Sequence, residues 1–425
     1  MSNLYVMKSG GLTGEVCIGG AKNSLLVLLA ASILTKEPVV IQNCPNISDV
    51  GNMIGILTKI GCRIEWEGKT IKIDSADADC WELSEQYSKK IRSSVFMLGS
   101  VLARFHKACV CHPGGCDIGT RPIDLHIKGL TYLNVRICDC GGKIVCETAN
   151  LVGSRIHLDY PSVGATENIM MAATLASGTT IIENAAREPE VVDLADMLNS
   201  MGAKVSGSGT DCITIEGVES LHGTTYRCIP DRIAAGTFMI GAAITRGRLL
   251  LKNIRPRHLE ALTEVLRDMG ARIECWEDRA LVDCIAPLHA PRRVICTQPY
   301  PGFPTDMQPQ MGALLATVSG KSWIRESVFD NRFKYIDELK KMGADITVDN
   351  DAALFSGVES LTGADVYAND LRGGAALVLA GIAAQGRTLV RNADVIDRGY
   401  ENFTGILQSL GADIAFAGEC SEDNT

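Results

Sequence analysis

The feature of this sequence that most restricts its fold is a unit of about 70 residues that occurs six times. One phrase of the unit is a helix end, a glycine and then a strand, as in LTKIGCRI at 57–64 and LNSMGAKV at 198–205. Glycine or asparagine is preferred at a left-handed helix C-cap, because other side chains suffer a Cβ clash there. The predicted cap positions are 68 or 73 residues apart, at Gly61, Asn134, Gly202, Gly270, Gly343 and Gly411.

A second recurring phrase is a helix of small residues followed by a turn and a strand. It reads AATLASGTTIIEN at 172–184 and AGIAAQGRTLVRN at 380–392. Such helices lack a wide polar face, so we expect them to be buried. Each unit therefore predicts two helices and about four short strands. Six units group most simply as three and three, giving two similar domains with a boundary near 229–232, and a cleft between similar domains is a common place for a substrate site.

The overall charge restricts the possible partners. The formal net charge is −9 at pH 7, and the chain has no basic tail or stripe, so we expect no nucleic-acid partner. The N-terminus has no export signal, and no apolar run reaches membrane-spanning length. These features predict a cytoplasmic protein that makes no use of a membrane.

The chain contains 16 cysteines, which we expect to be reduced because there is no export signal. Cys109-x-Cys111-His112 and Cys138-x-Cys140 suggest a metal site, but no second ligand pair follows at a zinc-like spacing. We expect each pair to alternate along a strand and pack as small hydrophobic groups. Cys116 is the exception among the 16, because it lies in a loop rich in glycine and proline. A nearby cation would make this thiol reactive, and a chemical role for it stays open on spacing alone.

Several charged residues interrupt the repeated pattern. Lys22, in GGAKN at 19–23, opens a helix after a strand and is either a solvated lysine or part of an anion site. Asp306 follows the proline-rich stretch Pro301–Pro304 and is either a helix N-cap or a general base. Further candidates are single arginines in separate segments, at Arg92, Arg121, Arg372 and Arg398.

These cations would be ordinary surface residues unless the fold brought them together. Together they would form a positive site in an acidic protein, suited to a substrate that carries phosphate and carboxylate groups. There is no Walker-type loop and no G-x-G-x-x-G after a strand, so nucleoside triphosphate and NAD chemistry are not supported. The residues alone indicate a transferase or lyase that acts on small phosphorylated acids.

At these residues the chain closely resembles the UDP-N-acetylglucosamine 1-carboxyvinyltransferase family of enolpyruvyl transferases. The matching stretches span nearly the whole chain. They are GGAKN (19–23), PGGCDIGTRPIDLHIKGL (113–130), PSVGATENIMMAATLASGTTIIENAAREPEVVDL (161–194), FPTDMQ (303–308), DNRFKYIDELKKMGA (330–344), DLRGGAALVLAG (370–381) and IDRGYENF (396–403).

The resemblance implies an α/β fold of two inside-out α/β barrels, each of three βαβαββ units, that close over substrate. Residues 22–230 would form the N-terminal domain, with the Cys116 loop as a lid. Residues 1–21 and 231–425 would form the C-terminal domain.

The implied reaction moves the enolpyruvyl group of phosphoenolpyruvate to the 3-hydroxyl of UDP-N-acetylglucosamine by addition and elimination, with release of phosphate. In this family that is the first committed step of peptidoglycan biosynthesis, and fosfomycin inhibits it. The resemblance implies no metal and no organic cofactor, and we expect a monomer whose partners are these two small molecules.

The resemblance also implies site roles. Cys116 matches the reactive cysteine that fosfomycin modifies, and Asp306 matches the base for the 3-hydroxyl. Lys22, Arg121 and Arg398 match the groups that hold phosphoenolpyruvate, with Arg92, Asp370 and Arg372 in the same polar cluster. The positions that match sugar-nucleotide contacts are Asn23, Arg121, Pro122, Ile123, Asp124, Leu125, Ser162, Val163, Gly164, Asp306 and Val328.

Two alternatives stay open. The chain could be a catalytically inactive paralogue that binds the sugar nucleotide and regulates, although Lys22, Cys116, Asp306 and Arg398 are all present. It could also use another acceptor. The related shikimate-pathway transferases share the repeat but have a different lysine motif and lack the PGGC loop, and RPIDLH with PSVGAT favours the uridine nucleotide.

Overall fold

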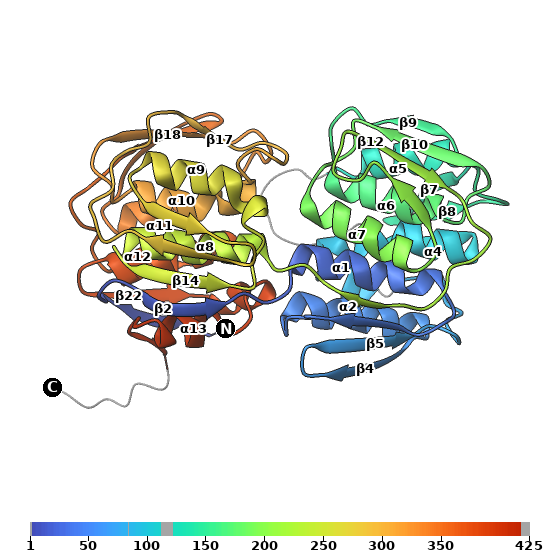
Figure 1. Cartoon of the computed structure of the whole chain (residues 1–425), viewed down its shortest axis with the longest axis horizontal. Helices are drawn as coiled ribbons and strands as arrows, with labels where there is room; N and C mark the ends of the chain where they lie inside the picture. The colour runs from blue at the N-terminus through green and yellow to red at the C-terminus, as the bar shows by residue number, and fades with distance from the viewer. Residues whose placement is uncertain (1, 84, 112–121, 418–425) are drawn as a thin grey trace. The chain divides into compact units, whose positions relative to one another are not determined.

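The computed structural model describes residues 2–83, 85–111 and 122–417 (Figure 1). The described residues form two compact units, one made of residues 20–229 and the other of residues 2–19 and 230–417. The family resemblance predicts domain boundaries at 21/22 and 230/231.

The unit of residues 20–229 contains three sheets of related topology. In two of them a parallel pair is extended by two antiparallel pairings: β13(Thr225–Arg227)-β3(Val39–Gln42)-β5(Thr70–Asp74)-β4(Arg63–Glu67) and β9(Arg155–His157)-β10(Thr179–Glu183)-β12(Cys212–Glu216)-β11(Lys204–Ser206). The third has three strands, β6(Lys107–Cys111)-β8(Lys143–Glu147)-β7(Arg136–Cys140). A parallel bridge between Glu82 and Cys109 stands where its fourth strand would lie, so this is the degenerate copy of the repeat.

The helices of this unit fall into two kinds. Three are buried almost throughout, α1(Lys22–Ala31), α4(Met97–Phe105) and α6(Val163–Ala173). Three are buried along one face, α2(Ser48–Ile60), α5(Asp124–Tyr132) and α7(Pro189–Ser200). Short helical turns complete the unit, η1(Ser32–Leu34), α3(Glu85–Ser88) and η2(Arg92–Phe96).

The other unit has three sheets with the same order of parallel and antiparallel pairings. They are β21(Asp365–Tyr367)-β22(Arg387–Arg391)-β1(Leu4–Met7)-β23(Ile414–Phe416), β2(Thr13–Cys17)-β14(Arg248–Lys252)-β16(Arg279–Asp283)-β15(Arg272–Cys275) and β17(Ile295–Cys296)-β18(Lys321–Arg325)-β20(Ala352–Ser356)-β19(Asp345–Asp349). The N-terminal segment thus supplies a strand to two of these sheets: β1 pairs with β22 and β23, and β2 pairs with β14.

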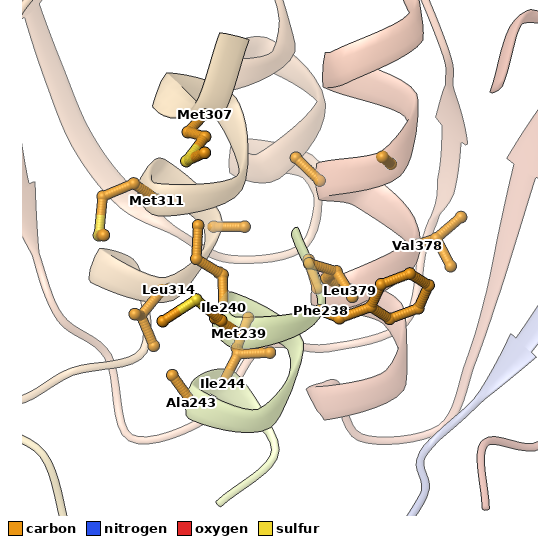
Figure 2. Packing of buried hydrophobic residues seen from close by; sticks show 14 of the residues in the cluster. Phe238, Met239, Ile240, Ala243, Ile244, Met307, Met311, Leu314, Val378 and Leu379 are labelled. Carbon is orange, nitrogen blue, oxygen red and sulfur yellow. The ribbon is translucent and has the colours of Figure 1, made fainter. Parts of the chain in front are cut away.

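The helices of this unit show the same division. The buried ones are α8(Arg232–Ile244), α10(Gln308–Leu315) and α12(Leu371–Ala383), and the others are α9(Glu260–Asp268), α11(Tyr335–Lys341), α13(Phe403–Ser409), η3(Pro256–Leu259), η4(Thr305–Met307) and η5(Ala393–Arg398). Figure 2 shows Phe238, Met311 and Leu379 among the side chains that fill the core around the three buried helices. Gly236 permits this packing, because a Cβ there would lie 2.6 Å from the Met307 sulfur. The predicted burial of the small-residue helices is therefore confirmed.

All six predicted C-cap positions have left-handed backbone. Their φ angles run from 67° at Asn134 to 108° at Gly61. Asparagine tolerates this region better than other residues that carry a Cβ. The substitution at position 134 therefore preserves the helix end, and the prediction of six caps is confirmed.

The expectation that every cysteine except Cys116 would pack in the interior is wrong. Cys109 and Cys111 are buried, and the segment at 81–83 pairs with β6 beside Cys109. Five other described thiols are exposed, at Cys17, Cys138, Cys140, Cys212 and Cys275. Each lies on a strand with one face open to solvent, and alternation along the strand points it outward. No helix in the described part of the chain is long and apolar enough to span a membrane.

Candidate active site

Most of the candidate residues lie at the N-terminal ends of the buried helices. Lys22 is the first residue of α1, Arg92 opens η2 just before α4, and Ser162 caps α6. In the other unit Asp306 lies in η4 just before α10, and Asp370 caps α12. A helix N-terminus carries partial positive charge and unpaired N–H groups, so these ends are suited to anionic ligands.

Lys22 is buried and ion-paired. Its side chain is 11% exposed, and its ammonium lies 2.8 Å from the carboxylate of Asp49 on α2. The interpretation of Lys22 as an ordinary solvated lysine is therefore wrong. The preceding residue, Ala21, provides no side-chain cap for α1, and Asn23 is the only exposed side chain of that helix.

A buried histidine that the sequence did not single out, His126, packs beside the start of α6, where sugar-nucleotide contacts are predicted. Asn168 on α6 donates to His126 Nδ1 at 2.8 Å and to the Val95 carbonyl at 2.8 Å. Burial, with a contribution from the charge of Arg92, lowers the pKa of His126 to about 3. His126 is therefore neutral at physiological pH, and since Nδ1 accepts a hydrogen bond, its proton is on Nε2.

Close packing fixes the start of α6 against this histidine. A Cβ on Gly164 would lie 3.0 Å from the His126 ring and 3.1 Å from Phe96. Ser162 accepts a hydrogen bond from the backbone N–H of Ala165, and the side chains of residues 162 and 163 are half-buried. Near the start of α5, Pro122 and Asp124 are exposed, and Ile123 and Leu125 are partly buried.

Asp306 is held by two arginines. Its carboxylate accepts from Arg332 Nη2 at 2.8 Å and from Arg372 Nη2 at 3.2 Å. Both arginines are buried, with side chains 2% and 3% exposed, whereas Asp306 is 27% exposed. The helix-cap interpretation of Asp306 is not supported, because η4 and α10 show no side-chain cap bond. Arg332 was not predicted, although it lies in the matched stretch DNRFK.

Two hydrogen-bond donor atoms of Arg372 are unsatisfied among the described residues. Its Nε and Nη1 atoms are buried and have no hydrogen-bond partner among the described residues, and its guanidinium lies 5.2 Å from the centre of the Tyr400 ring. Burial disfavours its charge, but Tyr400, Asp306 and Asp231 outweigh burial and raise the pKa of Arg372 above its ordinary value. A buried cation with unpaired N–H groups is costly unless an acceptor satisfies them, so an anionic oxygen would fit here.

Glu326 is a further residue that the sequence did not indicate, and its carboxylate connects separate segments of this unit through hydrogen bonds. One carboxylate oxygen accepts from the Thr297 hydroxyl at 2.9 Å and from the N–H groups of Val328 and Phe329 at 2.9 and 3.1 Å. The other accepts from the hydroxyl of Thr305, next to Asp306, at 3.0 Å. A single buried carboxylate therefore sets the positions of both the Asp306 turn and the Val328 loop.

Replacing Glu326 should weaken turnover without removing a reacting group. We expect Glu326→Ala to lower kcat/KM about 10²-fold, because a misplacement of about 1 Å at a reacting group has that effect. Glu326→Gln keeps one oxygen for the Val328 and Phe329 N–H groups, so it should recover most of that loss. Steady-state kinetics of both variants, with thermal unfolding beside them, checks this. Equal losses in the two variants at equal stability would contradict a positioning role.

The remaining predicted residues divide into two groups. Arg398 lies in η5 and is half-buried, in the same unit as Asp306, Asp370 and Arg372. Cys116 and Arg121 lie outside the described residues. The structure thus brings Asp306, Arg372 and Arg332 into direct contact within one unit, and it brings Arg92, the α5 start and the α6 start together within the other.

Comparisons with known proteins agree on one family. A family model described as EPSP synthase (3-phosphoshikimate 1-carboxyvinyltransferase) matches residues 6–407. UDP-N-acetylglucosamine 1-carboxyvinyltransferase 2 of Caldanaerobacter subterraneus subsp. tengcongensis is 51% identical, over 95% of this chain and 96% of the relative. UDP-N-acetylglucosamine 1-carboxyvinyltransferase 1 of Carboxydothermus hydrogenoformans is 48% identical, over 97% and 98%. The crystal structure of the enolpyruvyl transferase NikO from Streptomyces tendae superposes with a TM-score of 0.87 at 26% identity, covering 98% of this chain and 99% of NikO.

Proposed function

The chain belongs to the enolpyruvyl transferase family, and from that premise we propose that it transfers the enolpyruvyl group of phosphoenolpyruvate to the 3-hydroxyl of UDP-N-acetylglucosamine. The observation that carries the choice of acceptor is the 51% identity, over 95% of the chain, to a relative named for that sugar nucleotide. The family model itself bears the name of a shikimate-phosphate enzyme, so family membership alone leaves the acceptor open.

The proposed reaction has two balanced steps. In the addition, the sugar oxygen bonds to C2 of phosphoenolpyruvate, the hydroxyl loses its proton and C3 gains one. In the elimination, C3 gives up a proton, the bond from C2 to the phosphate oxygen breaks, and the double bond returns as phosphate leaves. Both steps move protons and redistribute negative charge, which positioned acids, bases and cations can promote.

Asp306 is the proposed base. Opposite charges favour the ionised form of a carboxylate, and Arg332 and Arg372 supply two of them within hydrogen-bond distance. The side chain is also the most exposed of the three, which suits a group that must reach a substrate hydroxyl. Lys22, Arg121 and Arg398 are the proposed phosphoenolpyruvate-binding cations, and Cys116 is the proposed acid at C3 and the fosfomycin target.

The proposal extends to organisation and partners. Residues 22–230 and residues 1–21 with 231–425 would each act as an enolpyruvyl transferase domain of a cytoplasmic monomer. The partners would be the two small substrates, and the net charge of −9 offers nucleic acid no favourable surface on average.

Phosphate release tests the proposed activity. The purified chain should release phosphate when phosphoenolpyruvate and UDP-N-acetylglucosamine are both present, because phosphate leaves only after the adduct has formed. Mixtures that lack either substrate serve as controls and should release none. Binding of the sugar nucleotide without any phosphate release would overturn the proposal and favour the regulatory paralogue.

A further inference from the structure

Two exposed thiols on β7 lie within contact distance of each other. The Sγ atoms of Cys138 and Cys140 are 3.5 Å apart, and both side chains are exposed. Residues two apart on a strand point to the same face. β7 is an edge strand whose only partner in its sheet, among the described residues, is β8 (Figure 1). Packing in a core therefore does not account for this pair.

We propose that this pair, the Cys138–Cys140 dithiol, chelates one thiophilic divalent metal ion, such as Zn²⁺ or Cd²⁺, through both sulfur atoms. A zinc–thiolate bond is about 2.3 Å long, so two sulfur ligands at a tetrahedral angle are about 3.8 Å apart. The sulfur atoms of the dithiol are separated by 3.5 Å. A small side-chain rotation therefore brings both to one ion, and the β7–β8 pairing need not change.

A disulfide between the same residues fits less well. It would require the sulfur atoms to approach from 3.5 Å to about 2.05 Å. A zinc ion with two thiolate ligands needs them about 3.8 Å apart, which is much closer to the separation in the structure.

The neighbouring charges leave the pair available. Arg136 pairs with Glu147 at 3.4 Å, and Lys143, which lies opposite Cys140, pairs with Glu82 at 2.6 Å. These basic groups are thus partly neutralised and repel a cation less.

Solvent would complete the coordination. Among the described residues no group of three or more His, Cys, Asp or Glu side chains could hold a metal ion. The dithiol would therefore supply two ligands, and water or a small ligand from solution the others. Thiolate pairs favour soft and borderline ions such as zinc over magnesium or calcium.

The test is a titration of the full-length, reduced protein with Cd²⁺ in the absence of oxygen, read by the ultraviolet absorption of cadmium–thiolate bonds. The wild-type protein should bind one equivalent of Cd²⁺ at the dithiol. The affinity for this equivalent should fall at least about tenfold in Cys138→Ser and in Cys140→Ser, because each variant keeps only one of the two sulfur ligands. Cys212→Ser removes another exposed thiol of the same unit and should retain that equivalent.

Enolpyruvyl transfer and thermal unfolding should be unchanged in these variants, and these two measurements serve as the control for correct folding. The proposed metal site does not depend on the proposed function. Cadmium binding that is equal in the wild-type, Cys138→Ser and Cys140→Ser proteins would overturn the proposal. Loss of the equivalent in Cys212→Ser instead would do the same.

Discussion

Replacing Asp306 by asparagine should lower kcat about 10²–10⁴-fold and change the fold little. Loss of a positioned general base has an effect of that size. Asparagine keeps an oxygen that can accept from Arg332 or Arg372, so both buried guanidinium groups retain a polar neighbour. Phosphate-release kinetics with both substrates saturating measures the expected loss.

The matched variant Asp306→Ala separates chemistry from structure. It leaves the buried Arg332 and Arg372 with no acceptor oxygen at this position, whereas asparagine keeps one. Removing one partner of a buried ion pair without such a replacement costs about 3–5 kcal/mol. We expect both variants to lose activity to a similar extent and the alanine variant alone to unfold at clearly lower denaturant concentration. A kcat of the Asp306→Asn protein near that of the wild type would show that Asp306 is a structural counter-ion and not the base.

Replacing Lys22 by alanine should lower kcat/KM about 10²–10³-fold and destabilise the protein. The activity effect follows from the proposed role of Lys22 in holding phosphoenolpyruvate, because the variant loses a preorganised cation. The stability effect arises because Asp49, whose side chain is 4% exposed, would lose its partner at 2.8 Å. A buried charge left in this way costs about 3–5 kcal/mol.

The double variant Lys22→Ala with Asp49→Asn decides between the two roles. Removing both charges eliminates the buried carboxylate that has lost its lysine partner, so most of the free energy of unfolding should return. If Lys22 contacts substrate, kcat/KM should stay low in the double variant. Recovery of activity along with stability would mean that Lys22 serves the fold alone. Asp49→Asn by itself measures how far that change affects either quantity.

The fold could be predicted from the sequence because its signals are local and repeated. Left-handed helix ends at Gly61 and Asn134 follow from backbone sterics, and small-residue helices such as 172–184 predict their own burial. The resemblance then gave the fold class, which the match to NikO confirms. The buried face of a strand is harder to predict, because alternation alone does not say which face is covered. The prediction that Cys138 packs in the interior is wrong for this reason.

The contacts within the candidate site could not be predicted from spacing. Glu326 acts through four hydrogen bonds to groups between Thr297 and Phe329, and nothing in its immediate sequence marks it. Arg332 and His126 lie in matched stretches, yet an arginine or a histidine is usually explained by simpler roles. Their importance follows from burial and partners, which depend on the tertiary structure.

The proposed function depends most on UDP-N-acetylglucosamine being the acceptor. The direct measurement is the mass of the product formed from phosphoenolpyruvate when UDP-N-acetylglucosamine and shikimate 3-phosphate are supplied in separate reactions. We expect an enolpyruvyl ether of the sugar nucleotide, with one phosphate released per product, and no reaction with shikimate 3-phosphate. An enolpyruvyl product of shikimate 3-phosphate, with the sugar nucleotide left unchanged, would contradict it.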